Sequence, residues 1–180
     1  VTAVARELLG KKLVTRFDGV ITAGVITETE AYAGAIDRAS HAYGGKRTTR
    51  NEVMYGPAGF AYVYLCYGIH HLFNVVTNIH GVAHAVLVRA IHPVEGADTM
   101  RERRHQSKLT TGGPGTLSQA LGILTIHSGI DLLGDLITIE ETGIRIPQRN
   151  LVIAPRIGVD YAQEDALLPY RYHFDPRMLQ

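Results

Sequence analysis

The fold of this chain is decided by residues 12–32, which read KLVTRF-DG-VITAGVITETEAY. The dipeptide Asp18-Gly19 separates two runs rich in apolar and β-branched residues, and this arrangement is a strong signal of a tight hairpin turn. The sequence therefore predicts two antiparallel strands, one over Lys12–Phe17 and one over Val20–Tyr32.

The chain on either side of this hairpin alternates short apolar runs with few helices. Residues 3–9 are expected to form a short amphipathic helix with Thr2 as its N-cap and Gly10 at its end, rather than a signal peptide. Pro93 and Pro114 each occupy a position typical of a first helical turn, so helices are predicted over 93–105 and 114–121. Further strands are predicted over 60–66, 72–77, 85–91, 136–140, 151–155 and 170–174.

Several strands at hairpin spacing, with few helices, predict an α+β fold whose sheet is mainly antiparallel. No internal repeat, low-complexity tract or linker interrupts the chain, so we expect a single domain over residues 1–180. The polar segment 33–59 is longer than an idle connection usually runs.

Composition places the chain among compact proteins with a real core. Of its 180 residues, 46% are apolar and 19% are charged, a balance that argues against disorder. No apolar run approaches the roughly 20 residues of a membrane helix, so no membrane partner is expected. Cys66 is the only cysteine. A single cysteine excludes an internal disulfide framework and a cysteine-only metal site, and it favours a cytoplasmic setting.

Charge is balanced overall but unevenly distributed. Eighteen basic and 17 acidic residues give a net charge of +1, which demands no anionic partner. Basic residues nevertheless gather in segments 46–50 and 101–108, whereas segment 131–141 is acidic. One face of the protein could therefore be positive, although solvated surface charge explains the clusters equally well.

The clearest chemistry lies in residues 26–32, ITETEAY. The two-residue period of a strand places Glu28, Glu30 and Tyr32 on one face. Two carboxylates on one face repel each other, so one pKa is expected to rise while a cation holds the other acid ionised. Such a pair suits a general base. The alternative is an exposed edge strand whose acids are solvated.

A second pattern, residues 60–74, combines aromatic residues with a predicted chain reversal. Tyr62 and Tyr64 share one strand face, and Tyr67 precedes Gly68 at the point where a hairpin must turn. A tyrosine at a hairpin tip cannot be buried by its own sheet, so Tyr67 and its neighbour Ile69 could wedge into stacked bases. The alternative is that Tyr67 folds back onto the sheet.

Two polar residues, Asn74 and Arg89, interrupt otherwise apolar strands. A buried arginine requires a carboxylate partner, and Glu28 or Glu30 is the obvious one. An ion pair between Arg89 and one of these two acids is therefore expected.

Taken in order along the chain, these residues resemble the alkyladenine (3-methyladenine) DNA glycosylase family of bacterial type. Each matching piece is weak evidence alone, but their order over nearly the entire chain is highly specific. The resemblance implies a compact domain with a curved antiparallel sheet and a protruding hairpin. It is carried by Glu28-Thr29-Glu30-Ala31-Tyr32, Ser40-His41, Gly44-Gly45, Arg50-Asn51, Tyr62-Val63-Tyr64, Tyr67-Gly68, Asn74, Leu87-Val88-Arg89-Ala90, Gly113-Pro114-Gly115 and Arg156-Ile157-Gly158-Val159.

The resemblance implies three catalytic roles. Glu30 aligns with the general base, which orients and deprotonates a water for attack on C1′ of an extruded nucleotide. Arg89 matches an arginine that helps to hold this water. Ile157 matches a residue that holds the water through its main-chain carbonyl.

The resemblance also implies a binding pocket for the flipped base. Tyr32 would stack on one face of the base, and His41 and Tyr64 on the other. Asn74 would crowd the exocyclic amino group of guanine and so reject normal guanine. Tyr67, flanked by Ile69, would fill the gap left in the duplex from the minor-groove side.

The implied function is that of a monofunctional DNA glycosylase, which starts base excision repair on double-stranded DNA. It would release alkylated or deaminated purines by hydrolysis, since no lysine lies near Glu30 to form a Schiff base. The candidate lesions are 3-methyladenine, 7-methylguanine, hypoxanthine and ethenoadenine. No cofactor or metal is implied, and a monomer is expected.

One departure from the family concerns the predicted helix start Gly113-Pro114-Gly115-Thr116, since the family usually has a lysine after this motif. The helix N-terminus can still bind a phosphate, but a positive charge is missing there.

Two other functions stay open at the level of sequence. The first is a metal-dependent hydrolase that uses His41, His70, His71 and one of the two acids. Adjacent His70 and His71 would face opposite sides of a strand, which disfavours a shared ion. The second is a non-catalytic nucleic-acid-binding module of similar architecture.

Overall fold

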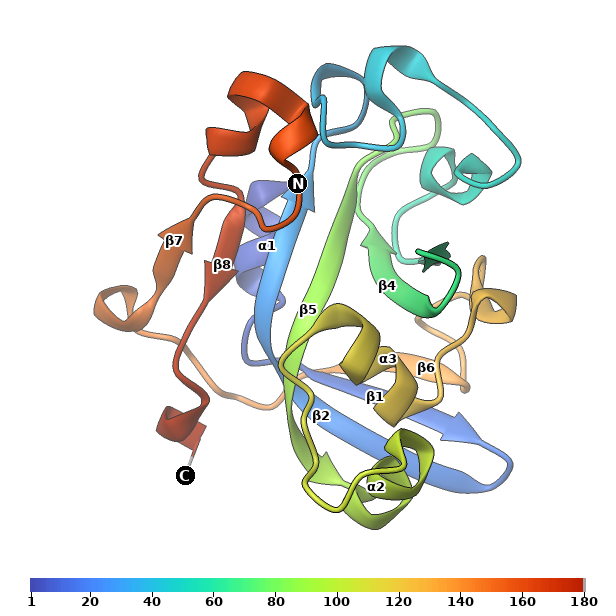
Figure 1. Cartoon of the computed structure of the whole chain (residues 1–180), viewed down its shortest axis with the longest axis vertical. Coiled ribbons are helices and arrows are strands. Elements are labelled where there is room, and N and C mark those ends of the chain that lie inside the picture. The colour runs from blue at the N-terminus through green and yellow to red at the C-terminus, as the bar shows by residue number, and fades with distance from the viewer. Residues whose placement is uncertain (180) are drawn as a thin grey trace.

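A computed structural model describes residues 1–179, and one curved sheet runs through them (Figure 1). Its main path has the order β3-β4-β5-β2-β1-β6, while β8 pairs with both β2 and β7, and every pairing is antiparallel. The predicted α+β fold with a mainly antiparallel sheet is confirmed. The strands are β1 (Lys12–Phe17), β2 (Val20–Tyr32), β3 (Ala61–Cys66), β4 (His70–Val76), β5 (Ala85–Glu95), β6 (Ile137–Glu140), β7 (Val152–Ala154) and β8 (Arg171–His173).

The first hairpin forms as its sequence predicts. Phe17 pairs with Val20, and the two residues between them have φ angles of 53° at Asp18 and 74° at Gly19. Two consecutive positive φ angles define the tight turn whose twist matches that of the flanking strands, and Asp-Gly tolerates them best. The turn thereby fixes the register of β1 against β2, and with it the face on which each side chain of β2 lies.

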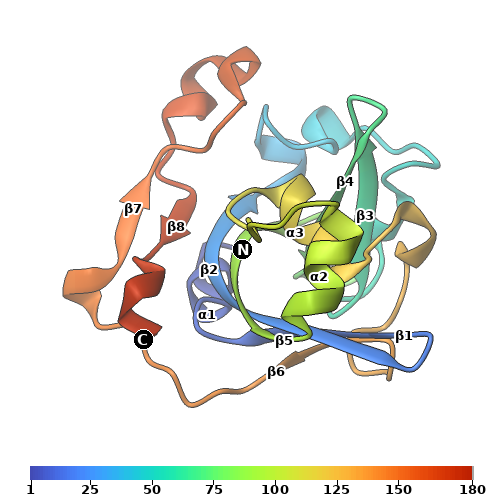
Figure 2. The same cartoon turned by 60° about the horizontal axis from the view of Figure 1, so that its bottom comes forward.

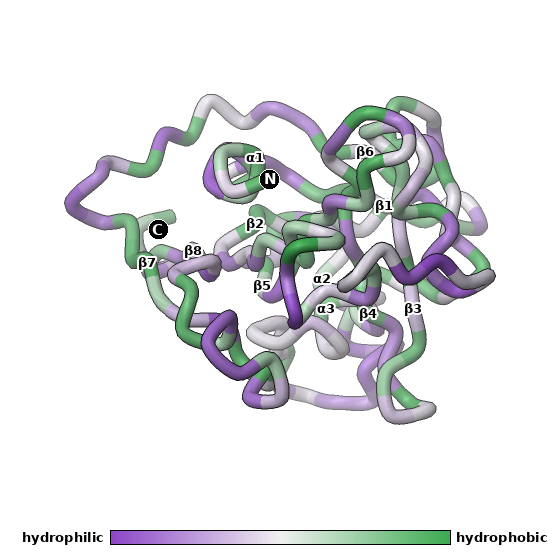
Figure 3. Tube along the Cα trace, turned by 90° about the horizontal axis from the view of Figure 1, so that it is seen from above, coloured by the Kyte–Doolittle hydropathy of each residue, from purple (hydrophilic) through white to green (hydrophobic). Residues whose placement is uncertain are grey.

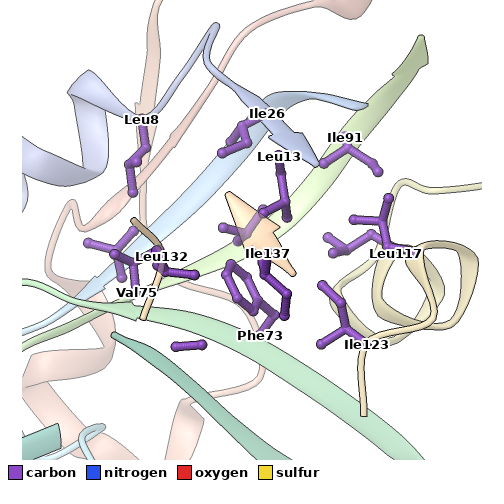
Figure 4. Close-up of a cluster of buried hydrophobic side chains, with 14 of the residues drawn as sticks. Leu8, Leu13, Ile26, Phe73, Val75, Ile91, Leu117, Ile123, Leu132 and Ile137 are labelled. Carbon is purple, nitrogen blue, oxygen red and sulfur yellow. The ribbon is translucent and has the colours of Figure 1, made fainter. Parts of the chain in front are cut away.

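Three α-helices, α1 (Thr2–Glu7), α2 (Ala97–Arg104) and α3 (Pro114–Leu121), flank the sheet. In Figure 2 the sheet curls around α3, with α2 beside it and α1 packed outside β2. None of these helices within residues 1–179 has the length and apolar character that a membrane crossing requires. The core is an apolar cluster contributed by the strands, by the three α-helices and by segments next to them. Figure 4 shows ten of its residues: Leu8, Leu13, Ile26, Phe73, Val75, Ile91, Leu117, Ile123, Leu132 and Ile137.

The helix predicted over 93–105 is wrong in its first turn. Strand β5 continues through Pro93, which pairs with Gly24, and helix α2 begins only after Gly96. Pro93 is tolerated in the strand because β4 pairs only with the first residues of β5, which leaves this end of β5 with one strand neighbour. Gly96 has a φ of 72°, and a Cβ there would lie 2.5 Å from the main-chain oxygen of Ile21.

The other predicted helices form with small changes. Helix α3 spans 114–121 as expected. Helix α1 ends at Glu7, two residues before the predicted end, and its N-cap is Val1 without a side-chain hydrogen bond from Thr2. Short 3₁₀ helices complete the structure at Gly34–Ile36, Tyr43–Gly45, Glu52–Tyr55, Thr125–His127, Gln148–Asn150, Asp160–Leu167 and Pro176–Leu179.

The C-terminal part of the chain leaves the sheet and then returns to it. Figure 3 shows the segment between β6 and β7 running along the outside of the molecule, where most of its residues are exposed. Strand β8 then pairs with β2 at Glu28, Thr29 and Glu30. The end of β2 that carries both acids therefore has β5 on one side and β8 on the other.

Candidate active site

Glu30 lies near the end of β2 and is completely buried. At this point β2 is an interior strand of the sheet, so the alternative of an exposed edge strand is wrong. The side chain of Glu28 is 17% exposed and lies on the same face, as the two-residue period predicts. Burying a carboxylate is costly unless it is paired and hydrogen-bonded, so its partners define the site.

The ladder between β2 and β5 is irregular beside these carboxylates. Arg89 lies between two β5 residues that pair with the consecutive β2 residues Glu28 and Thr29, so it is an extra residue on β5. A bulge of this kind re-aims a side chain, and bulges are common next to active sites. Arg89 Nε lies 3.1 Å from Oε1 of Glu28, and its Nη1 lies 3.4 Å from Oε1 of Glu30. The expected ion pair is confirmed, and it involves both acids.

Two further groups hold the Glu30 carboxylate. The Tyr32 hydroxyl donates to Oε2 at 2.8 Å, and the main-chain N–H of Ile157 donates to Oε1 at 2.8 Å. Burial is the largest influence on this carboxyl and raises its pKa, although Arg89 and the two hydrogen bonds act in the opposite direction. Glu30 thus combines a raised pKa with a fixed orientation.

Ile157 reaches this site through its backbone, while its side chain is half-exposed. The contact present is made by its N–H, on Glu30. The role that the resemblance implies concerns its carbonyl, and that role stays a prediction.

Arg156, which precedes Ile157, is a supporting residue that the sequence analysis did not single out. Its buried guanidinium makes a bidentate ion pair with Asp37, at N–O distances of 2.6 and 2.8 Å. It also donates to the main-chain oxygen of Ala31 at 2.9 Å, and its central carbon lies 4.8 Å from the centre of the Tyr32 ring. One side chain therefore ties the segment of Ile157 to the end of β2 and backs the Tyr32 ring.

A cavity of about 560 Å³ lies next to the groups that hold Glu30. Tyr32, Arg89 and Ile157 all line it, and Glu30 lies behind them. His41 and Tyr64 line it as well, so the structure brings the predicted base-stacking residues to one cavity.

His41 belongs to segment 33–59 and lines the cavity. This long connection therefore contributes a side chain to the candidate site. The side-chain amide of Asn51 donates to the main-chain oxygens of His41 and Lys46, both at 2.9 Å, and so closes this loop. His41 Nδ1 lies 2.8 Å from the Tyr62 hydroxyl, and its ring centre is 4.6 Å from that of Tyr64. Burial, helped by the nearby cations Arg50 and Lys46, lowers the pKa of His41 to about 4, so its ring is neutral at pH 7.

Asn74 is buried in β4 and also lines the cavity. Its amide nitrogen donates to the main-chain oxygens of Tyr62 at 3.1 Å and Leu72 at 3.2 Å. Asn74 therefore has a structural role in the β3–β4 hairpin, in addition to the selective role that the resemblance implies.

The tip of the β3–β4 hairpin projects from the sheet (Figure 2). Tyr67 is 90% exposed and Ile69 is 70% exposed. The expectation of an exposed tip is confirmed, and the alternative that Tyr67 folds back onto the sheet is wrong. Tyr67 has a φ of 51°, a left-handed conformation that costs a residue with a Cβ roughly 1–2 kcal/mol. A bulky aromatic kept in such a conformation is a reason to suspect function.

Helix α3 presents its first turn to the same cavity, through Gly113, Pro114, Gly115 and Thr116. The Thr116 hydroxyl accepts from the Gly113 N–H at 3.0 Å and donates to its carbonyl at 2.7 Å. Thr116 thus closes the helix start internally, at the position where the resemblance implies a lysine.

The basic cluster at 46–50 is only partly available to a ligand. Arg50 lines the cavity, and its guanidinium lies 5.1 Å from the centre of the Tyr64 ring. Arg47 instead pairs with Glu52. The first cluster therefore contributes Arg50 to the rim of the cavity.

The histidines considered for a metal site are used in other ways. His41 contacts Tyr62, and His71 Nδ1 accepts a hydrogen bond from the Thr125 N–H at 3.0 Å. His70 lies against Gly115 at the start of α3. Within residues 1–179, no three histidine, cysteine or acidic side chains are grouped so that they could hold a metal ion.

A model of the methylpurine-DNA glycosylase family matches residues 1–177. A Bacillus mycoides protein named "Putative 3-methyladenine DNA glycosylase" is 44% identical over 183 residues, which cover 96% of this chain and 90% of that protein. A protein of the same name from Bacillus cytotoxicus is 45% identical over 182 residues, which cover 95% of this chain and 89% of the relative.

Proposed function

This chain belongs to the methylpurine-DNA glycosylase family, and from that premise we propose that it flips a damaged purine out of duplex DNA and hydrolyses its N-glycosidic bond with a water activated by Glu30. Membership of a family of N-glycosyl hydrolases makes the protein an enzyme of DNA repair, in place of the non-catalytic module considered above. The proposed substrates are alkylated and deaminated purines.

The observation that carries the mechanism is the environment of Glu30. It is a buried carboxylate with two hydrogen-bond donors, an ion-paired arginine and a raised pKa, next to a cavity lined by aromatic rings. A general base works best when its pKa lies near the working pH, and burial moves the pKa of Glu30 in that direction. Its two oxygens are oriented by opposite sides of the site, Oε1 by Arg89 and Ile157 and Oε2 by Tyr32.

The water must reach Glu30 from the cavity. It would either replace the Tyr32 hydroxyl on Oε2 or bind between Glu30 and Arg89, whose 3.4 Å separation is the longest of the contacts to this carboxylate. Either position would bring the water next to Tyr32 and Arg89, which line the cavity, and a base stacked on Tyr32 would have to present its C1′ there.

The same carboxylate would stabilise the transition state. Cleavage of an N-glycosidic bond develops positive charge on the sugar, and a fixed negative charge nearby favours it. General-base catalysis alone supplies about 10²- to 10⁴-fold. Much of the remaining acceleration must come from the leaving group, and alkylated purines leave easily because they are already cationic.

The cavity accounts for recognition of the base. Tyr32, His41 and Tyr64 line one cavity, and an extruded purine would stack between Tyr32 and the other two rings, a mode of reading typical of base-flipping enzymes. A neutral His41 would not repel a cationic alkylated base, in agreement with its lowered pKa. Asn74 would reject the exocyclic amino group of guanine.

The hairpin tip accounts for extrusion. Tyr67, with Ile69 beside it, would insert from the minor groove into the gap that the flipped nucleotide leaves. Side chains inserted in this way partly unstack the neighbouring base steps and kink the duplex. Release of the base would be monofunctional, since no lysine is among the described residues that line the cavity. We propose that one monomer suffices.

The proposal is tested by measuring base release from four defined duplexes, each with one lesion: 3-methyladenine, 7-methylguanine, hypoxanthine or ethenoadenine. The reactions contain excess chelator. We expect release of at least the methylated purines, with an intact abasic strand as the second product. Strand cleavage through a covalent imine, which borohydride would trap, contradicts the hydrolytic mechanism. Loss of all activity in chelator contradicts the metal-free mechanism.

A further inference from the structure

Besides Arg89, a second cation, Arg171, contacts one acid of the pair Glu28 and Glu30, and the proposed mechanism gives it no role. Arg171, the first residue of β8, places its Nη1 3.1 Å from Oε1 of Glu28. The same carboxylate oxygen accepts from Arg89 Nε at 3.1 Å. Arg171, Glu28, Arg89 and Glu30 therefore form one chain of alternating charges, which ends at the buried Glu30.

Arg171 also contacts the segment that leads to Ile157. Its Nε donates to the main-chain oxygen of Pro155 at 2.9 Å, two residues before the N–H that binds Glu30. A single guanidinium on β8 therefore contacts Glu28, which belongs to the charge chain, and the Pro155 carbonyl, which lies two residues before the N–H that binds Glu30. The pairing of Arg171 with Glu30 in the β2–β8 ladder places it there.

We propose that Arg171 and Glu28 are positioning residues of the reaction: Arg171 compensates Glu28, so that Arg89 remains available to Glu30. Without Arg171, two carboxylates would compete for one guanidinium, and the less buried Glu28 would draw Arg89 away. Without Glu28, Arg89 would have Glu30 as its only acidic partner. This inference rests on the proposed function of Glu30 as the base.

Substitutions of Glu28 and Arg171 should shift the pKa of Glu30 in opposite directions. Glu28 carries a negative charge that raises the pKa of Glu30, whereas Arg89 lowers it. Replacing Glu28 by glutamine should therefore lower the pKa of Glu30. Replacing Arg171 by methionine leaves Glu28 uncompensated and should raise it.

The other titratable and charged groups around Glu30 are the same in both variants. Tyr32 contacts it from β2, and Arg156 lies behind the Tyr32 ring. Tyr64 of β3 influences Tyr32, and His173 of β8 lies near both Glu28 and Arg171.

The test is the pH dependence of single-turnover release of 7-methylguanine from a defined duplex. This leaving group is already cationic and needs no protonation. The fall of the rate at low pH (the acid limb of the pH profile) therefore reports the protonation of the general base, Glu30. We expect the limb to move by roughly half a pH unit or more, upward for Arg171→Met and downward for Glu28→Gln. The double variant should lie near wild type, and Arg171→Lys should restore the wild-type limb.

Two matched controls remove the same charges elsewhere. Arg177→Met loses an exposed cation of the C-terminal segment, and Glu102→Gln loses an exposed acid of α2. Both should leave the acid limb in place. A structural role alone would lower the rate of the Arg171 and Glu28 variants without moving their limbs in opposite directions.

The inference is overturned if the limbs of Arg171→Met and Glu28→Gln coincide with wild type or move in the same direction. If Arg171→Met does not fold, as judged by thermal melting, the sign of the Glu28→Gln shift decides alone. Glu30→Gln distinguishes a failure of the proposed role of Glu30 from a failure of the positioning role of Arg171 and Glu28. If it releases bases with a wild-type limb, the proposed function of Glu30 fails; if it is inactive and the other limbs stay unshifted, only this inference fails.

Discussion

The charge chain around Glu30 and the tip of the β3–β4 hairpin border the same cavity but are built on opposite principles. Glu30 is completely buried and is held by Arg89, Tyr32 and Ile157. Tyr67 is 90% exposed at the turn of the hairpin, in a backbone conformation that disfavours its side chain. The comparison teaches that stability and function are coupled in the first region and separable in the second.

The largest effect on stability is expected at the buried ion pair between Arg156 and Asp37, which supports the surroundings of Glu30. Arg156→Met removes one partner of the Arg156–Asp37 pair and leaves a carboxylate buried without its cation. Breaking such a pair costs about 3–5 kcal/mol, so the free energy of unfolding in urea should fall by that amount. Arg177→Met, which breaks the exposed pair with Asp175, is the control and should leave unfolding unchanged. Equal unfolding curves for the two variants would refute a supporting role for Arg156.

The hairpin tip should show the reverse pattern. Tyr67→Ser removes the proposed wedge and no buried contact. If Tyr67 inserts into the duplex, base release should fall by roughly tenfold or more, as expected for a contact worth about 1.4 kcal/mol or above. The thermal midpoint should stay at the wild-type value, because the side chain of Tyr67 is exposed and serine has a Cβ at the same φ of 51°. Melting and excision are measured on the same sample. A midpoint far below wild type would show that Tyr67 belongs to the core.

Asn74 stands between the two regions, since it holds the hairpin and lines the cavity. Asn74→Ser should lose about 1 kcal/mol of stability with its two main-chain hydrogen bonds. If Asn74 also excludes guanine, release of undamaged guanine or 7-methylguanine should rise relative to hypoxanthine. The ratio of these rates is the measurement. A uniform fall for all bases would leave Asn74 with its structural role only.

The smallest effect concerns pH and His41. Its pKa is about 4 in the folded protein against 6.5 when exposed, so the unfolded state binds more protons between these values. The contribution of His41 to stability is therefore complete above pH 6.5 and is lost as the pH falls toward 4. Between pH 7 and pH 5, the thermal midpoint of His41→Gln should fall by a few degrees less than that of wild type. Identical changes in both proteins would show that His41 is not held neutral by the fold.

The sequence was most informative where the signal is local. Asp18-Gly19 predicted the turn that sets the register of β2, and alternation along β2 placed Glu28, Glu30 and Tyr32 on one face. The exposed tip followed from Tyr67-Gly68 between two strand-like runs. These features depend on neighbouring residues, whose geometry the chain itself fixes.

The supports of the site depend on residues far apart in the chain, and no local pattern revealed them. Arg156 pairs with Asp37 across 119 positions, and Arg171 pairs with Glu28 across 143. Alternation in segment 170–174 does place Arg171 and Tyr172 on opposite faces of the predicted strand. It does not show which strand pairs with this segment. The helix predicted from Pro93 failed for a similar reason, since the pairing of β5 with β2 outweighs the local preference of proline.

The central claim is that Glu30 supplies the base while its neighbours position it. The most direct measurement is single-turnover base release by Glu30→Gln, together with its affinity for the same lesion duplex. Glutamine is nearly isosteric but carries no charge, so the account predicts loss of release with lesion binding retained. Glu28→Gln, on the same strand face, should keep a measurable rate. Near wild-type release by Glu30→Gln, or an inactive Glu28→Gln beside an active Glu30→Gln, would contradict the account.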